Sequence, residues 1–318
     1  MLRRRACHPF AGLRRRSSGR LLVAALLATV LPMTAVASAP KQLSVFVSVL
    51  PLATFAERIG GERVAVRAMV QPGHSPATYE PTPRQITALA DADLYLRVGV
   101  PFEDAWMQRI SATNPDMPVV DLRDGLTLRP QAAHTHDHGD GARHQQEGPR
   151  MDAHVWTSPR LVRQMAETIR AALTELDPAG AETYAANLAA LDAALAALDA
   201  ALQEQMGGLE NRSFLVYHPA WGYFADAYGL SQVPIEYEGK EPGARRLTAL
   251  IEQAQKNNAR VILVQPQFDQ RAAGQVARAI GGRVETVDPL SPDYFATLRR
   301  LAEILLDADA SSAEPHQP

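Results

Sequence analysis

Residues 181–206, AETYAANLAALDAALAALDAALQEQM, are the stretch that decides the fold. Its leucines recur at alternating spacings of three and four residues, the spacing of one face of an α-helix. They are Leu188, Leu191, Leu195, Leu198 and Leu202. Asp177-Pro178 precedes the stretch and Gly207-Gly208 follows it, so both ends carry helix-boundary signals. A coiled coil has the same spacing, but a rod of roughly 39 Å, at about 1.5 Å per residue, fits packing on two lobes equally well.

On both sides of this helix, short apolar strands alternate with helices, which predicts parallel sheets with covered faces. Strands are predicted at 43–50, 64–70, 93–98, 118–120, 213–217, 232–235, 261–264 and 284–287. Shorter helices are predicted at 51–59, 86–92, 102–110, 161–176, 220–228, 244–256, 271–280 and 294–306. The fold class is therefore α/β, with two (β/α) lobes of parallel sheets joined by one long rigid linking helix. The predicted boundaries are an N-terminal lobe 40–176, the linking helix 177–208, a C-terminal lobe 209–306 and a disordered tail 307–318.

The first 39 residues differ from the rest of the chain. They hold seven arginines and no acidic residue, followed by an apolar run over 21–36 and the small residues Ala37-Ser38-Ala39. This order is typical of a secretory signal peptide with its cleavage site. A membrane anchor is the alternative, but the apolar run is shorter than the ~18–20 residues that span a bilayer. We therefore predict export and removal of residues 1–39.

Charge and cysteine content restrict the partners of the exported chain. Without residues 1–39, 25 basic residues face 35 acidic ones, a net charge of about −10. This balance does not favour nucleic acid or an anionic membrane as a partner, and it suits a cation as ligand. The single cysteine, Cys7, lies within the signal peptide. The exported chain therefore has no thiol for a disulfide or for a thiolate metal site.

Three histidines and one aspartate lie where a parallel α/β protein binds its ligand. His74 and His154 lie in turns ahead of predicted helices, and His218 directly follows a predicted strand. Asp288 also directly follows a strand, and ligands of such sheets bind beyond the carboxyl ends of the strands. Three imidazoles and a carboxylate suit Zn²⁺ in four-coordinate geometry. Each histidine by itself is equally compatible with an ordinary solvated loop residue.

A second group of histidines lies in the segment 131–149, which has no apolar periodicity. It contains His134, His136, His138 and His144, with Asp137 and Asp140 among them. Such a composition is typical of a flexible loop that chelates metal weakly. We predict an auxiliary metal-collecting loop, and a solvated linker without a role is the alternative.

Several motifs together resemble the metal-specific solute-binding proteins of bacterial ABC importers, the group that contains the zinc-uptake and manganese-uptake proteins. The motifs are Pro72-Gly73-His74-Ser75-Pro76-Ala77-Thr78-Tyr79-Glu80-Pro81-Thr82-Pro83, the His-rich loop, Asp152-Ala153-His154-Val155-Trp156-Thr157-Ser158-Pro159, the long helix, His218 with Tyr223-Phe224-Ala225 and Tyr228-Gly229-Leu230, and Asp288-Pro289-Leu290. Together and in this order they are highly specific. The resemblance extends over nearly all of the chain after residue 39.

The resemblance implies one cation in a cleft between two lobes, bound in the periplasm by a monomer and passed to the membrane permease of an ABC importer. His154, His218 and Asp288 match metal-ligand positions of the family. The long His-rich loop and a histidine at 218, where manganese-type members have glutamate, resemble the zinc-type members. Zinc is therefore the expected metal, with Mn²⁺ or Fe²⁺ as alternatives.

One position departs from the family pattern. Family members have their first ligand histidine where this chain has Ala77, and His74 lies three residues upstream. Either the turn is reshaped so that His74 reaches the metal, or water or a carboxylate such as Glu80 replaces the missing ligand.

Two other functions are alternatives to a metal carrier. A zinc-dependent periplasmic hydrolase would need a base, for which Glu80 or Glu236 could serve, but neither H-E-x-x-H nor G-x-S-x-G occurs in the sequence. A binding protein or adhesin for an organic ligand or a surface partner would also fit two lobes. We therefore predict a transport protein rather than an enzyme.

Overall fold

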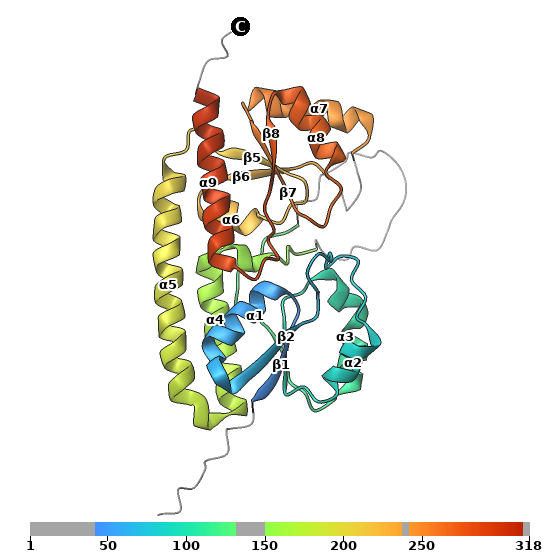
Figure 1. Cartoon of the computed structure of the whole chain (residues 1–318), viewed down its shortest axis with the longest axis vertical. Helices are drawn as coiled ribbons and strands as arrows, with labels where there is room; N and C mark the ends of the chain where they lie inside the picture. Colours follow the sequence, from blue (N-terminus) through green and yellow to red (C-terminus); the bar gives the residue numbers. More distant parts are fainter. Residues whose placement is uncertain (1–41, 132–149, 237–241, 314–318) are drawn as a thin grey trace, which may run out of the picture. The chain divides into compact units, whose positions relative to one another are not determined.

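The computed structural model describes residues 42–131, 150–236 and 242–313 (Figure 1). The first lobe alternates strands and helices: β1 (Leu43–Val47), α1 (Leu50–Gly60), β2 (Val64–Ala68), α2 (Pro83–Leu89), β3 (Leu94–Arg97), α3 (Pro101–Thr113) and β4 (Val119–Asp121). Its strands pair in parallel in the order β2-β1-β3-β4. The predicted signal peptide lies outside the described residues.

The second lobe repeats this plan. It consists of β5 (Ser213–Val216), α6 (Gly222–Ala227), β6 (Ser231–Pro234), α7 (Ala244–Lys256), β7 (Val261–Val264), α8 (Arg271–Ile280) and β8 (Arg283–Thr286). Its strands are also parallel, in the order β6-β5-β7-β8, which is the order of the first sheet. The predicted α/β class with two parallel-sheet lobes is confirmed.

Three long helices complete the structure: α4 (Pro159–Leu176), α5 (Ala181–Gly207) and α9 (Tyr294–Ala313). Figure 1 shows α5 running beside α4 and α9, and α5 packs on both and on α1. All five leucines of its predicted stripe are buried. Among the described helices, the segment Pro178–Gly207 is long and apolar enough to cross a membrane by composition. Its leucines are buried against protein, whereas 28% of the apolar window is buried, which is the pattern of an amphipathic helix with one exposed face.

One hydrophobic core continues from the first sheet through these helices to one face of the second sheet. Because side chains alternate along a strand, Phe214 and Val216 of β5 join this core. Leu215 and Tyr217 point the other way, into a smaller core beneath α7 and α8. The end of β5, which His218 follows, thus extends from this packed body.

The N-terminus of α2 differs from the sequence prediction. The predicted helix 86–92 lies instead at Pro83–Leu89. Thr82 and Gln85 form a capping box, in which the Thr82 hydroxyl accepts the Gln85 N–H at 3.3 Å and Gln85 Oε1 accepts the Thr82 N–H at 3.0 Å. This reciprocal cap, with Pro83 at the first helical position, begins the helix three residues early.

The end of the chain also differs. The predicted disordered tail 307–318 is wrong for residues 307–313, which continue α9 to Ala313. Leu305 and Ala308 are buried, and the Asp309 carboxylate accepts the N–H groups of Glu210 and Asn211 at 3.1 and 2.8 Å. Packing against the start of β5 therefore extends this helix. Residues 314–318 lie outside the described part.

The turn between α4 and α5 is held by Asp177. Its carboxylate accepts Arg63 Nε at 2.6 Å and Nη2 at 2.8 Å, and the Tyr184 hydroxyl at 2.6 Å. These bonds lower the pKa of Asp177 to about 2, and the hydrogen bonding with Arg63 has the largest effect. Since the pKa of an unfolded Asp is about 3.9, the ionised carboxylate stabilises the fold above that pH, and this contribution is lost as the pH falls towards 2.

We therefore expect Asp177→Asn to lower the melting temperature near pH 6 and to lose this difference from wild type as the pH is reduced to about 2. The measurement is thermal unfolding by circular dichroism across this range. Asp116→Asn, at an exposed position, serves as the control. A difference from wild type that stays constant over the whole range would contradict this role for Asp177.

Candidate metal centre

His154 is fixed by a buried aspartate two residues before it. His154 directly precedes the 3₁₀ turn Val155–Thr157, and its carbonyl oxygen accepts the Thr157 N–H at 3.1 Å. Asp152 Oδ1 lies 3.0 Å from the His154 backbone nitrogen and 2.7 Å from ring Nδ1. Asp152 is only 5% exposed, so it holds both the backbone and the ring of His154 in one orientation.

The charge of Asp152 determines which ring nitrogen of His154 is available. Burial opposes ionisation of Asp152, but its contacts with His154 and Arg129 outweigh that effect and lower its pKa below the usual value. An ionised carboxylate only accepts hydrogen bonds, so Nδ1 of His154 carries the proton. Nε2 keeps its lone pair, which is the state in which histidine binds a metal.

His218 has the same arrangement in the second lobe. It follows β5, and its carbonyl oxygen accepts the side-chain amide of Gln265 at 3.1 Å. Its Nδ1 is hydrogen-bonded to Glu236, which lies two residues after β6 and is 4% exposed. The carboxylate again leaves Nε2 as the nitrogen available to a ligand.

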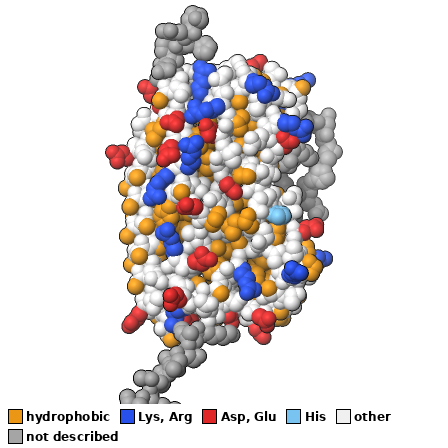
Figure 2. All heavy atoms as spheres, in the orientation of Figure 1, with side chains coloured by type: hydrophobic (Ala, Val, Ile, Leu, Met, Phe, Trp, Pro, Cys, Tyr) orange, Lys and Arg blue, Asp and Glu red, His pale blue; other side chains and the backbone are white. Residues whose placement is uncertain are grey.

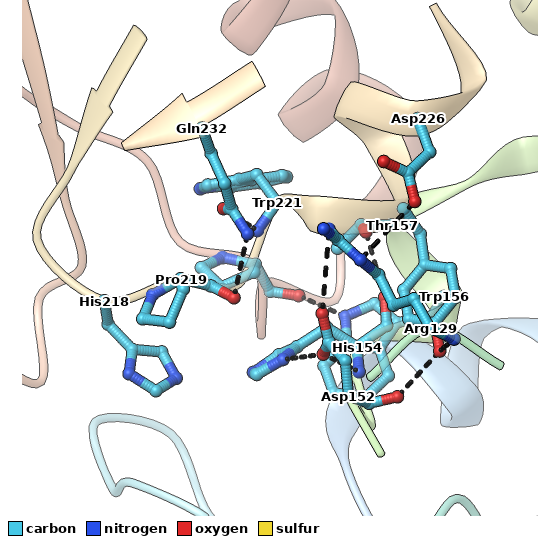
Figure 3. A network of polar contacts seen from close by, with 12 residues as sticks. Arg129, Asp152, His154, Trp156, Thr157, His218, Pro219, Trp221, Asp226 and Gln232 are labelled. Atoms are coloured by element: carbon cyan, nitrogen blue, oxygen red, sulfur yellow. Dashed lines mark hydrogen bonds and ion pairs between the residues drawn. The ribbon is translucent and has the colours of Figure 1, made fainter. Parts of the chain in front are cut away.

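The two imidazoles lie side by side (Figure 3). Their ring centroids are 5.3 Å apart and the ring planes meet at 69°. Two imidazoles bound tetrahedrally to one zinc at about 2.0–2.1 Å have centroids roughly 5 Å apart. The side chains of His154 and His218 are 18% and 20% exposed, so both are accessible to an ion from solvent.

Aromatic side chains restrict the rotation of both rings. Phe268 stacks on His218 with a centroid distance of 5.2 Å and an interplanar angle of 21°. Trp156 lies 5.2 Å from the His154 ring. Its indole N–H donates at 2.8 Å to the carbonyl oxygen of Pro289, in a buried contact. Trp156 therefore ties the segment that carries Asp288 to the segment that carries His154.

Asp288 follows β8 and is half-buried. Its Oδ1 accepts the Leu290 N–H at 2.9 Å, and Gln267 Nε2 lies 3.1 Å from each of its two oxygens. A small hollow places it opposite the loop that carries His74. The hollow is lined by Val49, Leu50, Val70, Gln71, Pro72, Gly73, Asp288, Leu290 and Pro292.

His74 lies on the surface of that loop. It is exposed, its Nδ1 lies 3.2 Å from the carbonyl oxygen of Pro72, and its ring meets Tyr79 edge-on at 5.7 Å. Ala77 and Glu80 are also exposed. Within residues 42–131, 150–236 and 242–313, no three His, Cys, Asp or Glu side chains are grouped to hold one ion. The structure thus brings together His154 and His218 of the four predicted ligands.

The predicted metal-collecting histidines His134, His136, His138 and His144 lie outside the described residues. The two ends of their segment are described, and they are paired. Pro130 and Met151 form an antiparallel bridge, flanked by hydrogen bonds from Gln131 N to Arg150 O at 2.8 Å and from Asp152 N to Arg129 O at 2.9 Å. The segment therefore leaves and rejoins the fold directly beside Asp152.

Arg129, at the paired ends of this segment, connects them to α6 (Figure 3). Its guanidinium lies 3.4 Å from Asp226 and 4.0 Å from Asp152. Tyr223 donates its hydroxyl to the Asp152 carbonyl oxygen at 2.8 Å and accepts the Arg129 N–H at 3.1 Å. Gly222 makes room for this contact, since a Cβ there would meet Arg129 Nη1 at 1.4 Å. The network braces the aspartate that orients His154.

Sequence reasoning missed the two carboxylates that orient the imidazoles. The role of Asp152 could have been predicted from the sequence, because an aspartate side chain often accepts the backbone N–H of the residue two positions later, which here is His154. Glu236 follows a strand, as His218 and Asp288 do, but its sequence context alone suggests only a base for a hydrolase. In the structure it is buried and bonded to His218, so it is engaged with the imidazole.

We expect Asp152→Asn and Glu236→Gln each to weaken zinc binding by about 10–100-fold, since a carboxylate that bonds a ligating histidine fixes its tautomer and raises its basicity. The measurement is competition with a zinc chelator at pH 7. Asp192→Asn is the matched control, because Asp192 is 41% exposed and pairs with Arg163 rather than with a histidine or with Arg129. If wild type and the three variants bind zinc with equal affinity, neither carboxylate supports zinc binding.

Comparison with known proteins shows the family to which this chain is similar. Residues 45–308 match the family model described as zinc-uptake complex component A, periplasmic (ZnuA). The high-affinity zinc uptake system protein ZnuA of Bacillus subtilis is 30% identical over 257 residues, which cover 78% of this chain and 79% of that protein. The zinc-binding lipoprotein AdcA of Streptococcus pneumoniae is 28% identical over 256 residues, so the chain spans about half the length of AdcA.

Solved structures are similar to this chain as well. A crystal structure of ZnuA is 37% identical, with a TM-score of 0.77, and the match covers 85% of this chain and 100% of that one. A 138–173 deletion mutant of ZnuA with zinc bound is equally similar, at 37% identity and a TM-score of 0.77 over 86% of this chain. With the family model matched over residues 45–308, this chain belongs to the ZnuA family of periplasmic zinc-uptake components.

Proposed function

We propose that this protein captures zinc outside the cytoplasm and delivers it to the permease of an ABC importer. The observation that carries the proposal is the pair His154 and His218. Their rings lie 5.3 Å apart, and each Nδ1 is held by a buried carboxylate. This is the spacing and the tautomer that two imidazoles need to bind one zinc ion. The zinc-uptake proteins among the relatives support the same function.

Zinc fits this pair better than manganese does. Imidazole nitrogen is a borderline donor that suits zinc, whereas manganese prefers oxygen donors in octahedral geometry. The buried carboxylates Asp152 and Glu236 add negative charge behind the two rings without being ligands. They offset the charge of the bound ion and strengthen the imidazoles as donors.

Binding proceeds in two steps in this proposal. Zinc first meets Nε2 of His154 and of His218, whose side chains are 18% and 20% exposed and already in position. Asp288 or His74 then completes the coordination by moving towards the ion from either side of the hollow beside Gly73. Neither binding step requires a change at the two Nδ1 atoms, because their carboxylate partners stay in place.

Release depends on small movements rather than on wide opening of the lobes. The main core is continuous from the first sheet through α4, α5 and α9 to the second sheet, so closely packed elements resist separation. The contact from Trp156 to Pro289 adds a further tie. Docking to the permease would release zinc by reordering loops such as the one that carries His74.

Export by a signal peptide at residues 1–39, a periplasmic location and a monomeric carrier complete the proposal. The hydrolase alternative has less support, because Glu236 is bonded to His218 and Glu80 lies on the exposed side of the loop after His74. Neither is placed as a base beside the imidazole pair.

The test is elemental analysis of the full-length protein expressed in a bacterium and purified without a tag, followed by zinc titration calorimetry. We expect close to one zinc per chain and tight binding that the double variant His154→Ala/His218→Ala loses. Stoichiometric manganese or iron instead of zinc would overturn the choice of metal. Zinc binding that survives in the double variant would overturn the proposed site.

A further inference from the structure

The loop after β7 contacts both His218 and Asp288 of the proposed site. Gln265 donates its side-chain amide to the His218 carbonyl oxygen at 3.1 Å, and Phe268 stacks on the His218 ring. Gln267, between them, donates Nε2 to both oxygens of Asp288 at 3.1 Å each. One short loop therefore contacts His218 and, through Gln267, Asp288.

The hydrogen bonds of Asp288 limit what it can offer to a cation. An ionised carboxylate has about four lone-pair sites, two on each oxygen. Oδ1 accepts both the Leu290 N–H and Gln267, and Oδ2 accepts Gln267. This leaves one site, on Oδ2, for a metal ion. A bidentate carboxylate at this position would require the Gln267 amide to move away.

Metals differ in how strongly this limit affects them. Zinc in a tetrahedral site is satisfied by two or three nitrogens and one oxygen. Manganese prefers a shell made mostly of oxygen donors, so it loses more when the carboxylate is restricted to one oxygen. The amide of Gln267 is neutral and competes for the same lone pairs as the cation. The hydrogen bonds of Gln267 thus weigh against manganese more than against zinc.

We propose that Gln267 is a specificity-determining residue, which restrains Asp288 and thereby lowers the affinity for manganese at the site formed by His154 and His218. The inference rests on the proposed function, because it concerns the same metal site. Gln267 acts through Asp288 and is not itself a ligand. It shapes selectivity by keeping the donor set rich in nitrogen.

The test compares manganese and zinc affinities of wild type, Gln267→Ala and Gln267→Met. Met keeps the length of the side chain and removes the amide donor, so it guards against a packing defect. Manganese binding is measured by the electron paramagnetic resonance signal of free Mn²⁺, and zinc binding by chelator competition. We expect manganese affinity to rise roughly tenfold, the scale of one charge-assisted hydrogen bond, and zinc affinity to change less than threefold.

Two further variants isolate the cause. Gln270→Ala is the matched control, because Gln270 lies in the same loop, is exposed and bonds Thr286 at 3.5 Å rather than Asp288. It should leave the manganese-to-zinc ratio unchanged. Adding Asp288→Asn to Gln267→Ala should abolish the gain in manganese affinity, because the freed carboxylate is then missing.

An unchanged manganese-to-zinc ratio in both Gln267 variants would overturn the inference. An equal loss of both affinities would also overturn it, since Gln267 would then position Asp288 as a ligand instead of restraining it. These outcomes differ from a failure of the proposed function. In that case His154→Ala and His218→Ala would leave zinc affinity intact, whatever the Gln267 variants show.

Discussion

Replacing either His154 or His218 by alanine is expected to weaken zinc binding on the order of 10³-fold. Each change removes one of two nitrogens that are oriented before the ion arrives. The loss should exceed that caused by removing the supporting carboxylates, for which about 10–100-fold is typical. Asp152 and Glu236 would also remain buried without the imidazoles that they bond in the native protein.

The measurement is zinc affinity by isothermal titration with a competing chelator, with the melting temperature of each metal-free variant recorded beside it. Removal of either imidazole also leaves a buried carboxylate without its partner, so the melting temperature is expected to fall as well, and affinities are compared at a temperature where every variant is folded. If both single variants bind zinc with the affinity of wild type, His154 and His218 are not zinc ligands. A loss confined to one of them would restrict the site to a single histidine.

Replacing Trp156 by alanine is expected to destabilise the fold by about 3–5 kcal/mol, the usual cost of removing a large buried aromatic side chain. Trp156 is 1% exposed, and its indole N–H donates to Pro289. Its loss would leave a cavity and deprive a buried carbonyl group of its donor. The variant should also weaken zinc binding, because the ring that packs beside His154 is gone.

Chemical denaturation measures this change, with Trp106→Ala as the control. Trp106 lies on α3 and is only half-buried, so its removal should cost clearly less. Trp156→Phe separates the two causes, because it retains most of the ring and removes the donor to Pro289. If Trp156→Ala and Trp106→Ala destabilise the protein equally, the contact between the two segments is not a main source of stability.

The sequence predicted the elements that local patterns determine. The leucine stripe of residues 181–206 became α5 within one residue of its predicted end, because its spacing matches the helical repeat. Apolar runs such as 261–264 became central strands with every residue buried. The pairing of His154 with His218 also followed from the sequence, because both positions belong to motifs that resemble known metal-ligand segments.

Contacts between distant residues could not be read in the same way. Glu236 reaches His218 because β6 pairs with β5, and the strand order β6-β5-β7-β8 is not contained in any local pattern. Gln267 reaches Asp288 for the same reason, through the neighbours β7 and β8. The extension of α9 depends on Asp309 meeting the start of β5. Strand order and helix packing, rather than local propensity, determine these contacts.

The most direct test of the central claim is a crystal structure of the zinc-loaded protein with anomalous scattering at the zinc edge. We predict one zinc peak with Nε2 of His154 and Nε2 of His218 both at about 2.0–2.1 Å, and each Nδ1 still bonded to its carboxylate. A zinc ion coordinated elsewhere, or bound by only one of these imidazoles, would contradict the account.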